Sequence, residues 1–134
     1  MRTISEFTSL ARDILGAWNE QDVEKVLSRY TGDVAYLDPN TRGEARGADA
    51  LRRYLTKLFG LWEMHWELRG EPYRFHDRDG CAAPWRATFR RPGGTAEVAI
   101  DGMDIVILDG DRISRNEIYF DRAALLPLLQ GEGG

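Results

Sequence analysis

The chain has 134 residues, a hydrophobic content of 43% and a formal net charge of −4 at pH 7. This length fits one domain, and the hydrophobic share is sufficient to bury a core. The acidic balance would repel phosphate backbones over most of the surface, so we expect no nucleic-acid partner. No apolar run approaches the ~20 residues needed to cross a bilayer, so we expect no membrane partner and a soluble, cytoplasmic protein.

The N-terminal part of the chain is predicted to begin with two helices. Apolar residues recur at helical spacing over residues 4–18, and Thr3 with Glu6 has the pattern of a capping box. Asp22 follows a polar break and is a suitable N-cap for a short second helix over residues 23–30.

A strand and a third helix are predicted next. Strand-forming residues fill positions 34–38, and Pro39, which has no N–H for a sheet, ends this strand and begins a polar loop. Asp38 therefore stands at the strand end. Asp49 is predicted to cap a third helix, whose apolar face continues as far as Trp62.

The second half is predicted to form a sheet, because hydrophobicity alternates with a period of two from Met64 onward. Turn signals separate further strands at about 73–77, 81–90, 95–108 and 112–120, as in an antiparallel meander. A short helix is expected over residues 123–129. Residues 1–130 thus form a single α+β domain, with three N-terminal helices on the sheet, and residues 131–134 are expected to be a disordered tail.

Four features accompany this order of elements: the run Trp18-Asn19-Glu20-Gln21-Asp22, the strand ending at Pro39, Gly47 before the third helix, and the late hairpin that starts at Asp104. Together they resemble the nuclear transport factor 2-like superfamily, closest to its SnoaL-like polyketide cyclases and ketosteroid isomerases. The resemblance implies a cone-shaped barrel with a strongly curved mixed, mostly antiparallel sheet. It also implies a pocket for a small apolar ligand, no cofactor, and a homodimer through the outer face of the sheet.

Two carboxylates are candidate catalytic residues. By resemblance, Asp38 falls where the isomerases carry their proton-shuttling Asp, and Asp104 falls where they carry the protonated Asp of the oxyanion hole. The Tyr that completes that hole would fall at Ile14, which has nothing to donate. Alternation places Asp104 on the apolar face of its strand, where lost hydration raises the pKa of a carboxyl and makes it a usable acid or base. Asp38 could equally bond the backbone of the turn that follows it.

The walls of the pocket are predicted to be mainly aromatic. Asn116 lies across the hairpin turn from Asp104 and should point to the same side, either to pair with Asp104 or to contact a bound oxygen. The remaining candidates are residues on inward faces that are equally typical of plain core: Ile14, Trp18, Tyr30, Tyr36, Tyr54, Trp85, Phe89 and Ile118.

The two histidines and the single cysteine are not expected to take part in catalysis. His65 and His76 are expected to be exposed, and the lone Cys81 is expected to be a small core residue. We expect no metal, because alternation directs Asp101 and Glu117 away from Asp104.

Three functions remain open at this point. The first is a cofactor-independent isomerase or cyclase that moves a proton next to a carbonyl of a small apolar or polycyclic metabolite, with Asp38 and Asp104 as the acid–base pair. The second is an epoxide hydrolase or dehydratase in the same pocket, although Arg86, which it would use, is expected to point outward. The third is a noncatalytic small-ligand-binding or dimeric interaction module.

Overall fold

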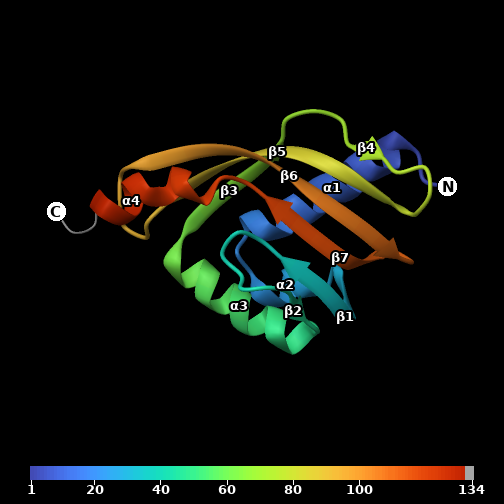
Figure 1. The fold of residues 1–134 in the computed structure, drawn as a ribbon, viewed down its shortest axis with the longest axis horizontal. Helices are drawn as coiled ribbons and strands as arrows, with labels where there is room; N and C mark the ends of the chain where they lie inside the picture. Colours follow the sequence, from blue (N-terminus) through green and yellow to red (C-terminus); the bar gives the residue numbers. More distant parts are fainter. Residues whose placement is uncertain (132–134) are drawn as a thin grey trace.

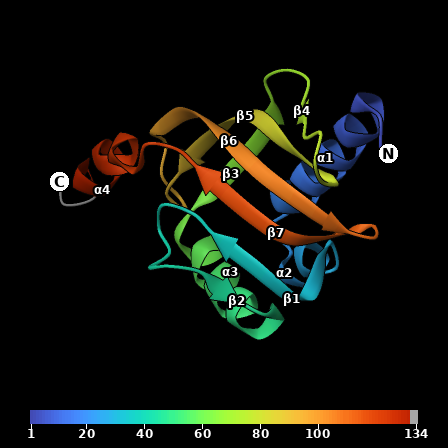
Figure 2. The ribbon, with the colours of Figure 1, turned by 45° about the vertical axis from the view of Figure 1, so that its right-hand side comes forward.

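The computed structural model describes residues 1–131 and has helices packed on one face of a single sheet (Figure 1). The covering helices are α1 (Ile4–Asn19), α2 (Val23–Leu27) and α3 (Ala48–Leu61). A 3₁₀ turn, η1 (Arg122–Leu125), and the short helix α4 (Leu126–Gly131) lie at the end of the molecule opposite the N-terminus (Figure 2). The α+β class and the order of helices are therefore as predicted.

The sheet has the order β2-β1-β7-β6-β5-β3, with β4 paired to β5. Its strands are β1 (Tyr30–Leu37), β2 (Ala45–Arg46), β3 (Glu63–Leu68), β4 (Tyr73–Arg74), β5 (Gly80–Arg90), β6 (Glu97–Asp109) and β7 (Arg112–Tyr119). Only the β1–β7 pair is parallel among the described strands, so the sheet is mixed and mostly antiparallel, as expected. It is not strongly curled, so the predicted strongly curved, cone-shaped barrel is not confirmed.

Two of the three predicted helix caps are confirmed. Thr3 and Glu6 form a reciprocal capping box at the start of α1, and the Asp22 carboxylate accepts the backbone N–H of Lys25 at the start of α2. The prediction of Asp49 as the cap of α3 is wrong. Gly47 holds that position with a φ of 85°, a left-handed conformation that favours glycine, so α3 starts before Asp49.

Three strand boundaries differ from the prediction. β1 starts at Tyr30, which the sequence pattern assigned to the second helix, because Tyr30 pairs with Ile113 of β7. β2 was not predicted, since a two-residue strand is too short to show alternation. β4 ends at Arg74 instead of 77, because the chain then turns and the Phe75 N–H donates to the Gly80 carbonyl oxygen.

The core lies between the helices and the inner face of the sheet and is rich in aromatic rings. Trp66 of β3 and Trp85 of β5 meet edge to face, with ring centroids 4.6 Å apart. Gly102 of β6 stands opposite Trp85, and a Cβ there would come within 2.4 Å of the indole. Glycine is therefore required at this position for Trp85 to lie flat against the sheet.

The chain ends fall partly outside the described residues. α4 includes Gly131, the first residue of the predicted tail, whereas residues 132–134 are not described. Over residues 1–131, no helix has the length and apolar character needed to cross a membrane.

Candidate functional site

Asp38 lies just beyond the end of β1, with only 7% of its surface exposed. One carboxylate oxygen accepts the hydroxyls of Tyr36 and Tyr54, at 2.7 and 2.5 Å. The other accepts the backbone N–H groups of Asn40 and Thr41, at 2.7 and 3.1 Å. Two carboxylate oxygens offer about four acceptor sites, so Asp38 is saturated with donors.

Asp38 therefore has both kinds of neighbour that the sequence allowed, the backbone of a turn and a space in the core. It binds the backbone of the turn after Pro39, and it also faces a small void in the core, which we call the Asp38 void. Burial, together with the negative charge of Asp38, raises the pKa of Tyr36 and Tyr54 well above the ordinary value for tyrosine. The two phenols thus stay protonated as donors to Asp38.

The Asp38 void has a volume of about 10 Å³, close to the minimum for one water molecule. Its lining is largely aromatic and consists of Trp18, Tyr36, Asp38, Asn40, Leu58, Met64, Trp66, Phe89, Ile118 and Phe120.

Asp104 lies in the middle of β6 with 8% of its surface exposed. The indole N–H of Trp85 donates to one carboxylate oxygen at 2.7 Å, and the amide of Asn116 donates to the other at 3.4 Å. The predicted proximity of Asp104 and Asn116 is confirmed.

The pKa of Asp104 is raised from its ordinary 3.8 to about 7. Loss of hydration on burial is the main cause, and the negative charge of Asp38 adds to it. The hydrogen bonds from Trp85 and Asn116 favour the charged form and limit the rise. Asp104 can therefore exchange a proton near neutral pH, as the sequence pattern led us to expect.

A chain of hydrogen bonds leads to Asp104 from α1. The indole N–H of Trp18 donates to the Tyr30 hydroxyl at 3.3 Å, and that hydroxyl donates to the amide oxygen of Asn116 at 2.7 Å. The amide nitrogen of Asn116 then donates to Asp104 and to the Ile105 carbonyl oxygen. Tyr30, predicted as a pocket wall, is thus a member of this polar chain.

A second void, the Asp104 void, separates Asp104 from α1 and has a volume of about 20 Å³. Ile14 lines it, so the position that resemblance assigned to a hydroxyl donor does face Asp104 but has no polar group. The lining is otherwise apolar apart from the Trp85 N–H and a thiol: Leu10, Ala11, Ile14, Leu15, Leu68, Cys81, Ala83, Trp85, Asp104 and Val106.

The two voids share no lining residue. Trp66 lines one and Trp85 the other, and their contact separates the two carboxylates. Of the predicted walls, Trp18, Tyr36, Phe89 and Ile118 face the Asp38 void, and Ile14 and Trp85 face the Asp104 void. Tyr54 binds Asp38 directly.

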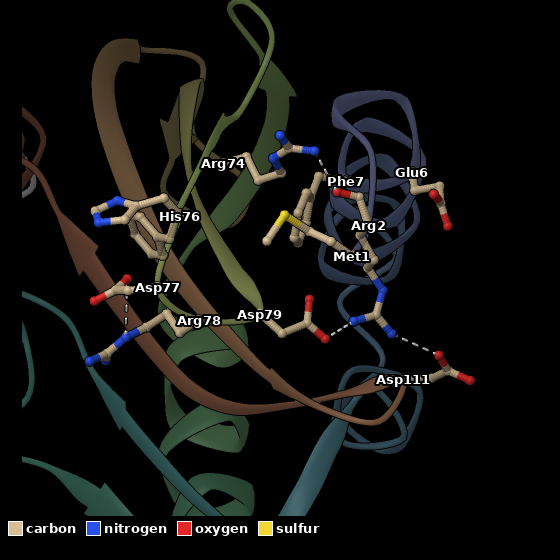
Figure 3. Close-up of a pocket in the computed structure, with 11 residues that line it drawn as sticks. Met1, Arg2, Glu6, Phe7, Arg74, His76, Asp77, Arg78, Asp79 and Asp111 are labelled. Carbon is tan, nitrogen blue, oxygen red and sulfur yellow. Dashed lines mark hydrogen bonds and ion pairs between the residues drawn. The ribbon is translucent and has the colours of Figure 1, made fainter.

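A wide depression in the surface lies between the start of α1 and the loop before β5 (Figure 3). Its volume is about 670 Å³. Arg2 holds its edges together, since its guanidinium pairs with Asp79 and Asp111. Phe7, which lines the depression, lies one helical turn before Leu10 and Ala11 of the Asp104 void.

The remaining reactive side chains are two histidines, Arg86 and Cys81, of which only Cys81 lies beside one of the two carboxylates, in the lining of the Asp104 void. His65 and His76 are exposed, and Arg86 is exposed and bonded to Asp101 at 2.8 Å, all as predicted. Cys81 is buried, as predicted, and desolvation raises its pKa to about 12, so it is an unreactive thiol. Over residues 1–131, no group of three or more His, Cys, Asp or Glu side chains is placed to hold a metal.

Sequence reasoning missed several residues that surround Asp38. It did not assign Tyr36 and Tyr54 as donors to Asp38. Tyr36 could have been found, because it lies two residues before Asp38 and alternation puts both on one side. Tyr54 could not, because it comes from α3. Sequence reasoning also placed Met64 and Trp66 only in the core, although strand alternation puts both on the face that lines the void.

The profile of the SnoaL-like domain family matches residues 11–116, most of the chain. The protein belongs to the SnoaL-like family. Its matched region starts within α1 and ends at Asn116, so it includes both aspartates. Among curated proteins, none matches the sequence significantly.

Solved structures show that this SnoaL-like chain has the NTF2-like fold. A Bacillus subtilis protein provisionally named an isomerase is 12% identical, with a TM-score of 0.83 and 97% of each chain covered. TerC, co-crystallised with polyporic acid, is 17% identical, with a TM-score of 0.76 and 91% of this chain and 96% of TerC covered. An NTF2-like protein of unknown function from Burkholderia pseudomallei is 16% identical, with a TM-score of 0.76 and coverages of 90% and 94%. At these identities the likeness concerns the fold.

Proposed function

We propose that this SnoaL-like protein is a cofactor-independent enzyme of the isomerase or cyclase type that transfers a proton next to a carbonyl of a small apolar metabolite. Asp104 is the proposed proton-transfer group. The observation that carries the proposal is a buried carboxyl, with a pKa of about 7, on the wall of an otherwise apolar void. Near neutral pH both its forms are populated, which suits a group that must first accept and then donate.

The proposed reaction needs only this one carboxyl to carry the proton. The Asp104 carboxylate takes a proton from the carbon beside the carbonyl, and the electron pair of the broken C–H bond forms an enolate. The protonated Asp104 then returns the proton to another carbon of the conjugated system, which restores the carboxylate. In a cyclase, the enolate carbon would instead attack a second carbonyl, whose oxygen takes the proton.

We assign Asp38 a different role from that of a free base. Its four donors occupy the carboxylate, so a substrate proton could reach it only after one donor moved. Tyr54 is the donor best placed to move, because it is half-buried on α3 whereas Tyr36 is fully buried. Asp38 therefore acts in this proposal as a hydrogen-bond acceptor that orients two phenols.

A metabolite needs more room than the Asp104 void offers in this structure. We propose that it enters from the surface depression along α1, past Phe7 (Figure 3). The helix presents Phe7, Leu10, Ala11 and Ile14 in succession from the depression to the void. Displacement of Phe7 would join the two spaces.

The test is exchange of carbon-bound protons with D₂O, followed by NMR for a panel of aromatic and polycyclic ketones. This assay detects enolate formation without knowledge of the product. We expect wild-type protein to catalyse exchange for at least one compound, and Asp104→Asn to lose that exchange.

Asp101→Asn is the matched control, because Asp101 lies on the same strand but on its exposed face. It should retain the wild-type rate. Full exchange by Asp104→Asn would overturn the assignment of Asp104, and absence of exchange with every ketone in wild-type protein would favour the next candidate.

A noncatalytic module is the second candidate, and the small volumes of both voids favour it. In that case the aspartates would only complete a closed core. Differential scanning calorimetry with the same ketones adds to the exchange assay, since a ligand that binds the native state raises the melting temperature. A raised melting temperature without exchange would support a noncatalytic binder, and an unchanged melting temperature with every ketone would support a closed core.

We also propose that the protein forms a homodimer through the outer face of the sheet. This face has the half-buried Ile105 and the exposed Tyr119. The rest of the surface is formed by the charged Arg86, Arg90 and Glu97 together with Thr88 and Ala99. Light scattering should give a dimer mass for wild-type protein and a monomer mass for Ile105→Glu. A monomeric wild type at micromolar concentration would rule this interface out.

A further inference from the structure

We propose that Tyr30 is a positioning residue, which holds the Asn116 amide with its N–H toward Asp104 although Tyr30 itself lines neither void. The inference deepens the proposed function, because it names what controls the protonation of the proposed catalytic group. It starts from the direction of each hydrogen bond in the chain from Trp18 to Asp104.

The direction of the first bond is fixed by chemistry. An indole N–H can only donate, so the Tyr30 oxygen must accept from Trp18. The single proton of the Tyr30 hydroxyl then lies toward its other partner, at 2.7 Å, which must be an acceptor. The Asn116 atom that faces Tyr30 is therefore the amide oxygen.

The other side of the same amide is fixed as well. Its nitrogen faces two groups that accept, the Ile105 carbonyl oxygen at 3.2 Å and the Asp104 carboxylate at 3.4 Å. Asn116 is only 1% exposed, so bulk solvent does not compete for either contact. Tyr30 thus anchors the oxygen end of a side chain whose nitrogen end stabilises the Asp104 carboxylate.

Few other groups near Asp104 can influence its protonation. α1 and β3 present only apolar side chains to the void, namely Leu10, Ala11, Ile14 and Leu15 of α1 and Leu68 of β3. β5 contributes the Trp85 indole and the protonated thiol of Cys81. The charge of Asp38 acts across the core. Asn116 and Trp85 are therefore the groups that favour the charged form of Asp104.

The variant Tyr30→Phe removes one hydroxyl and keeps the ring. Without the hydrogen bond from the Tyr30 hydroxyl, the Asn116 amide can move away from Asp104, to which its hydrogen bond is already long at 3.4 Å. The charged form of Asp104 then loses this stabilising hydrogen bond. We expect the titration midpoint of Asp104, measured by carboxyl ¹³C NMR, to rise by about one-half to one pH unit. Tyr36→Phe is the matched control, since this buried tyrosine bonds Asp38 instead, and it should leave the midpoint nearly unchanged.

A double-mutant cycle tests whether Tyr30 acts through Asn116. Asn116→Leu should raise the midpoint by about one pH unit, and Tyr30→Phe should add nothing in that background. If Tyr30→Phe only loosened the core, water would reach Asp104 and the midpoint would fall, which would overturn the proposal. An unchanged midpoint would also overturn it.

These titrations need no substrate, so their outcome is separate from that of the exchange assay. If catalysis by Asp104 is also correct, Tyr30→Phe should shift the pH–rate profile of exchange by the same amount as the titration midpoint.

Discussion

The two buried aspartates of this core differ because one follows a strand and the other lies within one. Beyond the end of β1, backbone N–H groups are free of the sheet, and two of them reach Asp38. In the middle of β6, the backbone is paired with β5 and β7, so only side chains can reach Asp104. Asp38 consequently has four donors and Asp104 two. Position along a strand thus decides how well a buried carboxylate is compensated.

This difference has a functional consequence. A fully compensated carboxylate is a stable part of the structure, whereas an undercompensated one can change protonation near neutral pH. The two aspartates face small, separate voids with no lining residue in common, so the packing around one can be altered without a change in the lining of the other. They remain coupled through charge, because the negative charge of Asp38 raises the pKa of Asp104.

The largest expected effect comes from Phe7→Ala. Removal of this buried ring should lower the free energy of unfolding by about 3–5 kcal/mol and open the Asp104 void to the surface depression. Hydrogen exchange of the Trp85 indole N–H, measured by NMR, should then accelerate. Leu58→Ala is the control at the Asp38 void, and it should leave that exchange slow. Equal Trp85 exchange in wild type and Phe7→Ala would show that Phe7 is not the barrier.

The next effect is a dependence of stability on pH. The pKa of Asp104 is about 7 in the folded state and about 3.9 in an unfolded chain. Between these two pKa values the native state binds more protons than the unfolded chain, so the free energy of unfolding falls as pH rises. The whole pKa difference corresponds to about 4 kcal/mol, of which about 3 kcal/mol is lost from pH 5 to pH 8.

Urea denaturation at pH 5 and pH 8 measures this loss. Wild type and the surface control Asp101→Asn should both show it, whereas Asp104→Asn should lack it because its amide does not titrate. A loss of equal size in Asp104→Asn would assign the pH dependence to other groups.

A smaller effect is expected at the other aspartate. Asp38→Asn replaces an oxygen that accepts two phenol hydroxyls by an NH₂ group, and it should cost about 2 kcal/mol at pH 7. Urea denaturation should separate this variant from Asp101→Asn, which alters only an exposed ion pair and should cost less than about 1 kcal/mol. Equal costs for the two variants would mean that Asp38 is not a saturated structural anion.

Much of the fold could be predicted from the sequence, because it depends on local signals. The capping box at Thr3, the cap at Asp22 and the alternation around Asp104 each act over a few residues, and each is confirmed. The cap at Asp49 was wrong because Gly47, with its left-handed φ, is the N-cap, so the helix starts two residues earlier than predicted. The curl of the sheet depends on interactions summed over many strands, so no local pattern could specify it.

The site could be predicted only in part, because the sequence pattern reports contacts within and between neighbouring strands but not contacts between distant elements. Alternation along two neighbouring strands was enough to bring Asp104 and Asn116 together. The contact of Asp38 with Tyr54 depends on how α3 packs on β1, and the separation of the two voids depends on the meeting of two indoles. Such contacts between distant elements leave no periodic signal in the sequence.

The most direct test of the account is the titration of Asp104 in wild-type protein, without ligand. Carboxyl ¹³C NMR would assign its resonance by the absence of that signal from Asp104→Asn. The account predicts a midpoint near pH 7. A midpoint near pH 4, the ordinary value for an aspartate, would contradict it, because Asp104 would then be a fixed anion like any surface carboxylate.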